Sequence, residues 1–162
     1  MRTAPRSPYR RAMTTKTDFT EQEWDLVLAG PPTAGMIVMT ASRGGMMRET
    51  FAMAKAYAEA RQQHGESALL DEIVATKPTR DHTHYSSLDE AKRQGLERLH
   101  EAVAVLEGKA TADEVEDYRR FVLAVADRVA ERHEEHGEKV SPDEQAARQD
   151  VAGALGTSPA PA

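Results

Sequence analysis

Apolar side chains recur at three- and four-residue intervals along much of the chain, and this spacing predicts helices. Within 87–107 the repeating positions are Leu88, Ala91, Gly95, Leu99, Ala102 and Leu106. Within 111–136 they are Val115, Tyr118, Val122, Val125 and Val129. Each set forms one apolar stripe, as expected for a helix that packs on a core. No segment sustains the alternation of a strand, so the sequence predicts an all-α protein.

Four segments begin with a Ser or Thr that is followed three residues later by Glu. These pairs are Thr20 with Glu23, Ser87 with Glu90, Thr111 with Glu114, and Ser141 with Glu144. In such a capping box the hydroxyl accepts a hydrogen bond from an amide of the first turn, while the carboxylate accepts one from the amide of the cap residue. Phe19 and Trp24 flank the first box at the spacing of a hydrophobic staple. Each pair therefore predicts a helix start.

Three further helices are predicted between the first and second capping boxes. A short one begins at Pro32, because proline is tolerated in a first helical turn, and ends before Gly44. A longer one covers about 46–64, and another covers 67–76 and stops before Pro78. Together with the four capped segments, these make about six or seven helices.

The two long helices, 87–107 and 111–136, are expected at the centre of the fold. Only residues 108–110 separate them, and so short a link predicts an antiparallel hairpin. The expected architecture is a single-domain helical bundle over 18–155 around this hairpin. The flanking segments lack apolar periodicity, so we expect a disordered basic tail over 1–17 and a flexible tail over 156–162.

Composition narrows the class of protein. The chain has 162 residues and no cysteine, so disulfides and thiolate metal sites are excluded. Its 21 basic and 27 acidic side chains give a net charge of -6, which argues against nucleic-acid binding, since that binding relies on Lys and Arg neutralising phosphates. No apolar stretch is long enough to span a membrane, and no apolar core of a signal peptide follows the N-terminal arginines. We therefore expect an acidic, cytoplasmic protein.

Charge is distributed unevenly between the tail and the domain. The segment 1–17 has no acidic side chain and contains Arg2, Arg6, Arg10, Arg11 and Lys16. The rest of the chain then carries 16 basic and 27 acidic side chains. Such a tail could contact an acidic partner, nucleic acid or the protein's own acidic surface, or it could be solvated. Met13 offers an alternative start just before the first helix signal.

Two blocks of the chain have a distinctive residue order. The first holds Phe19-Thr20-Glu21-Gln22-Glu23-Trp24, Gly30-Pro31, Gly35, Ala41-Ser42-Arg43-Gly44-Gly45, Glu49 and Lys55, and the second runs from Val140-Ser141-Pro142-Asp143-Glu144 through Leu155. Over about 18–76 and 123–155 this order resembles an uncharacterised family of small, all-helical bacterial proteins. The final Ser-Pro-Asp-Glu start is also similar to TerB-like helical domains associated with tellurite resistance. The shared motifs are helix caps and turns, so the resemblance implies a fold and no activity.

Motifs for catalysis are few. Glu97 and His100 form Glu-x-x-His, the ligand pair of di-iron bundles, but such bundles need two copies and two further glutamates. At about 100° per residue, Glu97 lies opposite the apolar stripe of its helix and is expected to point to water. The chain has neither cysteine nor a Gly-x-Ser-x-Gly elbow. The sequence therefore favours a protein without catalytic activity.

Four of the six histidines form the strongest candidate site. His133 and His136 continue the apolar stripe of the second long helix, and His82 and His84 lie just before the first. If the two helices run antiparallel, the end of one comes level with the start of the other, which brings the four imidazoles together. Neutral imidazoles suit Zn, Ni, Cu or Fe. Alternatively, the later pair interacts with the dipole at the helix end, or forms a pH-sensitive contact.

Two functional hypotheses result. The leading one is a non-enzymatic protein-interaction or self-association module that binds an unknown protein partner or forms a homo-oligomer, without nucleic acid or membrane. Its support includes six methionines, since methionine-rich surfaces adapt to partners. They are Met13, Met36, Met39, Met46, Met47 and Met53. The alternative is a metal-binding or metal-dependent enzyme that holds Zn or another transition metal through the histidines His82, His84, His133 and His136.

Overall fold

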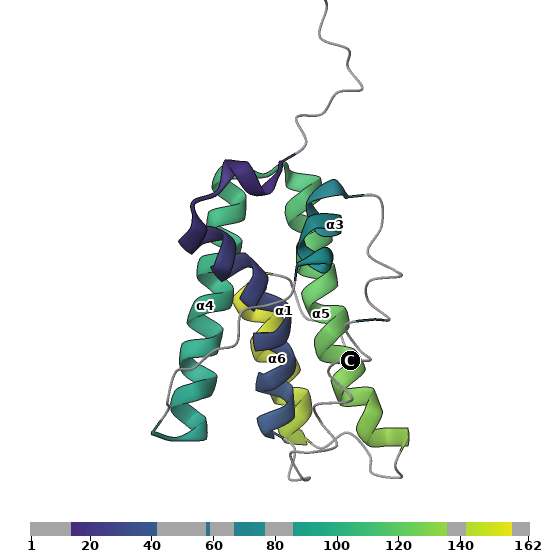
Figure 1. Cartoon of the computed structure of the whole chain (residues 1–162). Helices are drawn as coiled ribbons and strands as arrows, with labels where there is room; N and C mark the ends of the chain where they lie inside the picture. The colour runs from purple at the N-terminus through teal and green to yellow at the C-terminus, as the bar shows by residue number, and fades with distance from the viewer. Residues whose placement is uncertain (1–13, 42–57, 59–66, 77–85, 136–141, 157–162) are drawn as a thin grey trace, which may run out of the picture.

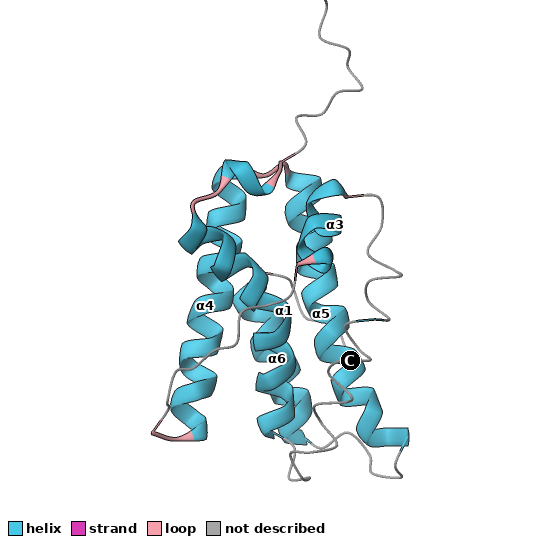
Figure 2. Cartoon of the chain, viewed as in Figure 1, coloured by secondary structure: helices cyan, strands magenta, loops and turns pink. Residues whose placement is uncertain are grey.

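The computed structural model describes residues 14–41, 58, 67–76, 86–135 and 142–156 (Figure 1). Helices account for 89% of these residues, and none of them forms a strand (Figure 2). The elements are the 3-10 helix η1 (Lys16–Asp18), α1 (Glu21–Ala41), α3 (Ala68–Ala75), α4 (Leu88–Lys109), α5 (Ala112–Glu135) and α6 (Pro142–Leu155). The predicted all-α class is confirmed over the described residues. No helix among them is long and apolar enough to cross a membrane.

The middle of the bundle is occupied by α1. It packs against both α4 and α5, and α6 packs against all three of these helices (Figure 1). The short α3 lies beside the upper part of α5. Ala110 and Thr111 join α4 to α5 at one end of the bundle, and α1 and α6 lie between the far ends of these two helices. Of the predicted helix 46–64, the structure describes only residue 58, which is helical, and the rest lies outside the described residues.

The core is built from the apolar stripes that the spacing predicts. Tyr118 and Val122 of α5 have no exposed surface, and neither do Leu99 and Leu106 of α4. The exception is Leu88, the first residue of α4, which is 65% exposed although it belongs to the same stripe. The stripe of α4 therefore begins one turn before the packed core does.

One continuous helix, α1, passes through Pro31 and Pro32, and the prediction of a separate helix beginning at Pro32 is wrong. A proline inside a helix lacks the amide that would donate to the carbonyl four residues back, so Pro31 leaves the Val27 carbonyl without its helical donor. Tyr118 of α5 replaces that donor, because its hydroxyl donates to the Val27 oxygen at 2.7 Å. A hydrogen bond from another helix thus satisfies the carbonyl that Pro31 leaves without a donor, at the point where the sequence predicts a helix boundary.

Two glycines let α1 and its neighbours approach closely. A Cβ on Gly30 would lie 2.0 Å from the hydroxyl oxygen of Tyr118, so only glycine leaves room for that hydroxyl. A Cβ on Gly95 of α4 would lie 3.1 Å from a side-chain carbon of Ile37 in α1, which is tighter than ordinary van der Waals contact. The absence of side chains at these positions sets how closely α1 packs on α5 and on α4.

The predicted capping boxes form where the structure describes them, except that Glu90 accepts hydrogen bonds from Ser86 and not from the amide of its cap residue Ser87. The Thr20 amide donates to Glu23 at 2.8 Å, and the Glu23 amide donates to Thr20 Oγ1 at 3.2 Å. Ser87 accepts from the Glu90 amide at 3.1 Å, as predicted. The Glu90 carboxylate, however, accepts from the hydroxyl and amide of Ser86, and these hydrogen bonds lower the pKa of Glu90. The box at Ser141 lies outside the described residues.

The last helix, α6, is fastened to its neighbours by two arginines. Arg119 of α5 donates through Nε to the Leu155 carbonyl at 2.6 Å, and its guanidinium pairs with Glu107 of α4 at 2.7 Å. A cation in this position also complements the negative end of the α6 dipole. Arg148 of α6 pairs with Asp127 of α5 at 2.5 Å. Arg119 therefore connects α5 to the ends of α4 and α6.

Candidate functional site

The four histidines of the predicted metal site lie outside what the structure describes. His82, His84 and His136 fall in segments that are not described, and the same holds for the side chain of His133 near the end of α5. The start of α4 and the end of α5 lie at the same end of the bundle, with α1 and α6 between them (Figure 1). Among the described residues, no group of three or more His, Cys, Asp or Glu is placed to hold a metal ion. The shared site stays a prediction.

A dense set of polar contacts lies at the opposite end of the bundle, where α1 and α5 begin and α4 ends (Figure 1). We call it the polar junction, and its members are Thr14, Asp18, Thr20, Glu23, Lys109, Thr111 and Glu114. Thr20 and Glu23 cap the start of α1. Thr111 and Glu114 cap the start of α5, and Lys109 is the last residue of α4. The junction exists because three helix ends converge.

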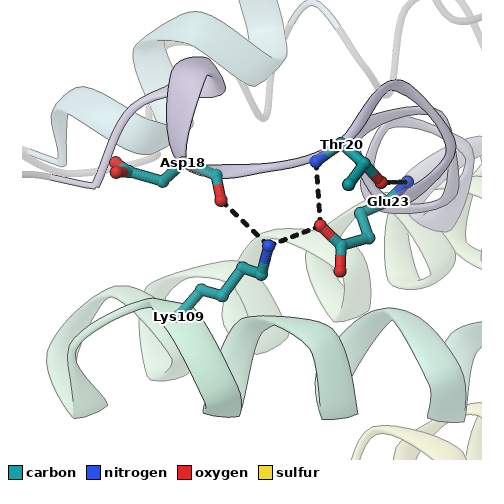
Figure 3. Close-up of polar contacts among 4 residues, drawn as sticks. All are labelled: Asp18, Thr20, Glu23 and Lys109. Atoms are coloured by element: carbon teal, nitrogen blue, oxygen red, sulfur yellow. Dashed lines mark hydrogen bonds and ion pairs between the residues drawn. The ribbon is translucent and has the colours of Figure 1, made fainter.

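Lys109 connects the end of α4 to the start of α1. Its Nζ donates to the Asp18 carbonyl at 3.0 Å and to Glu23 Oε2 at 2.6 Å (Figure 3). The same nitrogen lies 5.7 Å from the centroid of the Phe19 ring, which is within the range of a cation-π contact. A positive charge here also complements the negative end of the α4 dipole. The ammonium group is therefore held by a carbonyl, a carboxylate and a ring.

Glu23 is the carboxylate that these contacts share. Its Oε2 accepts from Lys109 and, at 2.8 Å, from the Thr20 amide (Figure 3). The hydrogen bond from Lys109, and after it the one from the Thr20 amide, lowers the pKa of Glu23 below its ordinary value of 4.5. A carboxyl with a lowered pKa is poorly matched to proton transfer near neutral pH. Glu23 is thus suited to holding Lys109 and not to acid-base catalysis.

Glu114 ties the N-terminal segment to the start of α5. Its Oε2 accepts from the Thr111 amide at 2.9 Å, and its own amide donates to Thr111 Oγ1 at 3.2 Å, which completes the predicted capping box. Thr14 donates to the same carboxylate through its amide at 3.0 Å and its hydroxyl at 2.6 Å. Only 5% of Thr14 is exposed. The packed chain therefore extends into the segment 1–17, which the sequence assigns to a tail.

An aromatic pair supports the junction from the core side. The ring centroids of Phe19 and Trp24 lie 5.6 Å apart, with the planes tilted by 41°, so the predicted hydrophobic staple makes contact. Trp24 is 3% exposed. Its Nε1 has no hydrogen-bond partner, and it is the one buried side-chain nitrogen or oxygen in the described part of the chain in that state. Trp24 therefore contributes to the stability of the fold through packing.

The contacts of the polar junction are suited to holding helix ends together and not to catalysis. A nucleophile needs a neighbouring base and an open approach. The hydroxyls of Thr14, Thr20 and Thr111 are each used in the caps or in docking the N-terminal segment. The sequence predicts the two caps but not their convergence, because no local pattern signals that Lys109 contacts Glu23, which lies 86 positions away.

The Glu-x-x-His pair of α4 faces solvent, as the helix geometry predicts. The Glu97 side chain is 61% exposed and lies 3.5 Å from Arg93, one turn earlier. His100 is exposed as well. A di-iron site needs both side chains in the core of the bundle, so this pair does not supply one.

Comparison with known proteins does not assign the chain to a family. No protein-family model, no curated protein and no solved structure matches the chain. The resemblance to a bacterial helical family, and the further likeness to TerB-like domains, therefore stay expectations from the residue order. Inferences about function rest on this chain's own residues.

Proposed function

We propose that the protein is a non-enzymatic, cytoplasmic helical module that acts by binding another protein or a second copy of itself. The observation that supports this proposal is the exposed start of the α4 stripe. Leu88 is 65% exposed, whereas the next two members of the stripe, Ala91 and Gly95, are buried. An apolar helical stripe that continues beyond the core offers a face on which a partner helix can pack.

Other apolar side chains of α1 and α4 are also partly exposed. Leu96 lies two turns after Leu88 on α4, and Met39 lies close to the end of α1. Both pack on the core and keep part of their surface exposed. The end of α1 and the start of α4 lie at the same end of the bundle (Figure 1). Because a methionine side chain adapts its shape to its neighbours, Met39 suits a surface that must fit a partner.

A charge introduced at Leu88 tests the proposal. Wild type, Leu88→Glu and the matched control Ala104→Glu, which alters another exposed position of α4, are compared by sedimentation equilibrium over a range of concentrations. If copies associate through this end, Leu88→Glu lowers the average mass toward that of the monomer and Ala104→Glu does not.

If the wild-type protein is monomeric, the expected partner is a different protein, and a cross-linking experiment tests for it. The chain has no cysteine, so Leu88→Cys introduces a single thiol for site-specific cross-linking inside cells. The expected result is a defined cross-linked product that an Ala104→Cys control does not form. A monomeric wild type that forms no such product from position 88 would contradict the proposal.

The alternative function is metal binding through the corner formed by His82, His84, His133 and His136, with Zn or another transition metal as the ligand. It is supported by the placement of four of the six histidines near the ends of the two long helices in the sequence. Metal that binds only the folded state adds about 2.7 kcal/mol of stability at a hundredfold excess over Kd. Protons compete for imidazole, so this gain fades below about pH 6.

The metal measurement has a matched pair of variants. Replacing His133 and His136 together with Ala should abolish both the bound metal and the rise in Tm, whereas replacing His64 and His100 should preserve them. Metal content is measured in protein purified without a polyhistidine tag. Equal behaviour of the two double variants would exclude the histidine corner as the site.

We also infer that the complete domain, 18–155, contains six or seven helices around an antiparallel hairpin formed by α4 and α5. The two-residue link between α4 and α5 supports the hairpin. The spacing of apolar residues within 46–64 supports a further helix, and its repeating members are Met47, Phe51, Ala54 and Ala58. The resemblance to the bacterial helical family implies the same class of fold. Backbone chemical shifts without helical values over 46–64 would contradict this arrangement.

A further inference from the structure

The segment 14–18, which contains η1, crosses the end of the bundle where α4 is joined to α5 (Figure 1). Its sequence is Thr-Thr-Lys-Thr-Asp, so it has no large apolar side chain. Thr14 is buried, and the four residues after it are at least partly exposed. A segment that buries little apolar surface opens at a low cost in free energy. The position of 14–18 on the bundle therefore depends on polar contacts.

Two carboxylates from different helices hold this segment. Glu114 of α5 accepts a hydrogen bond from the Thr14 amide at 3.0 Å and another from the Thr14 hydroxyl at 2.6 Å. Glu72 of α3 accepts one from the Lys16 amide at 2.7 Å. The two carboxylates lie 100 and 56 positions along the chain from their donors. The segment is therefore fastened to α5 at one point and to α3 at another.

Phe19 marks the boundary between this segment and the apolar core. The residue is 9% exposed, and its ring centroid lies 5.6 Å from that of Trp24. Its backbone is extended, with φ -111° and ψ 150°, so the chain changes direction between η1 and α1. Lys109 holds the neighbouring Asp18 carbonyl at 3.0 Å. The contacts of Phe19 and of α1 do not depend on Glu114 or Glu72.

We propose that residues 14–18 form a strap that opens and closes as a unit about Phe19, with Glu114 and Glu72 as its two anchors. Opening breaks only contacts of the strap itself, and Glu114 continues to accept from the Thr111 amide at the start of α5. Opening makes the two carboxylates available to other donors, so the strap controls access to this end of the bundle. This device goes beyond the proposed binding function and does not rest on it.

Amide hydrogen exchange of the full chain, followed by NMR, tests whether the strap exists. The amides of Thr14, Lys16 and Asp18 report on it, because an isolated 3-10 turn does not persist once the anchors are lost. They should be protected, yet exchange faster than the buried amides of α5 and with little dependence on denaturant. Unprotected amides would mean that the closed state does not form. Exchange only together with α5 would mean that the segment opens only when the whole protein unfolds, and either result would overturn the proposal.

Glu114→Gln tests whether the two anchors act together. The new side chain keeps one oxygen for the cap of α5 and loses the second acceptor, so the closed state should be weakened about tenfold. If the strap is a unit, the amides of Lys16 and Asp18 should accelerate by about the same factor as that of Thr14, although neither donates to Glu114. Acceleration confined to Thr14 would overturn the proposal.

Glu72→Gln provides the reciprocal measurement. It weakens the anchor of Lys16, and the strap predicts faster exchange at Thr14 as well, which donates to the other anchor. Glu101→Gln is the matched control, because it removes an exposed carboxylate of α4 and changes the net charge equally. It should leave the exchange of all three strap amides within about twofold of wild type. Equal acceleration by Glu101→Gln would attribute the effect to net charge, and the proposal would fail.

Discussion

The polar junction and the contact between Tyr118 and Val27 both tie α1 to later helices, but in opposite surroundings. In the junction, the side chains of Lys109 and Glu23 are 32% and 29% exposed. Tyr118 has no exposed surface. Water and salt compete with the junction contacts, whereas solvent cannot reach the buried hydroxyl. The junction has more polar contacts, and the buried site has the one that solvent cannot replace.

This difference determines what the loss of a partner costs. A partially exposed donor or acceptor that loses its protein partner turns to water, so the net change in free energy is small. A buried carbonyl that loses its donor keeps the full cost of its desolvation. The number of hydrogen bonds at a site is therefore a poor guide to its contribution to stability.

The largest expected effect comes from Gly30→Ala. In an open helix this change stabilises, since Ala is the better helix former by about 0.8–1.0 kcal/mol. Here the new Cβ would lie 2.0 Å from the Tyr118 hydroxyl oxygen, so the ring must shift and we expect a loss of about 1–3 kcal/mol in the free energy of unfolding. The measurement is urea denaturation.

The matched control for Gly30→Ala is Gly108→Ala in the last turn of α4. A Cβ at Gly108 meets nothing within 4 Å. We expect this control to raise stability by about 0.5–1 kcal/mol, the ordinary difference between Gly and Ala in a helix. If both variants are stabilised, the close approach of Tyr118 to Gly30 does not constrain the fold.

Local patterns are sufficient to predict the parts of the fold that depend on neighbours in the chain. The stripe that contains Val122 and the cap formed by Thr20 and Glu23 follow from spacings of a few residues, and the structure confirms both. The continuity of α1 does not follow from such spacings. Pro31 and Pro32 predict a break locally, and a hydroxyl from another helix overrides that prediction.

The same limit applies to the candidate sites. The sequence places Lys109 in the link after one long helix and Glu23 at the start of another helix, yet their contact depends on how those helices pack. The convergence of His82, His84, His133 and His136 is an inference of the same long-range kind, and it remains to be tested. Leu88 shows the reverse case, because its spacing predicts burial and its exposure follows from where the packed core begins.

An intermediate effect is expected at the junction from Glu114→Ala. The substitution removes the acceptor of the Thr111 amide and of both donors of Thr14. Loss of the cap and of the docked N-terminal segment should lower the free energy of unfolding by about 1–2 kcal/mol, measured in urea. Glu101→Ala, at an exposed position of α4, is the control and should stay within about 0.5 kcal/mol of wild type. Equal losses in the two variants would mean that Glu114 has no special role.

The smallest effect is the pH dependence that Glu23 contributes. Hydrogen bonds from Lys109 and from the Thr20 amide lower its pKa in the folded state below the ordinary value of 4.5. A lowered folded-state pKa adds stability above about pH 4.5, and that stability disappears as the pH falls through the folded-state value. Wild type should therefore exceed Glu23→Gln in urea midpoint at pH 7, and the two should converge toward pH 3. Glu21→Gln, which removes an exposed carboxylate two positions earlier, is the matched control for the change in net charge. A constant difference between wild type and Glu23→Gln down to pH 3 would show that the Glu23 carboxylate contributes through packing and not through its charge, which would remove the electrostatic part of the contrast between the junction and the buried Tyr118 contact.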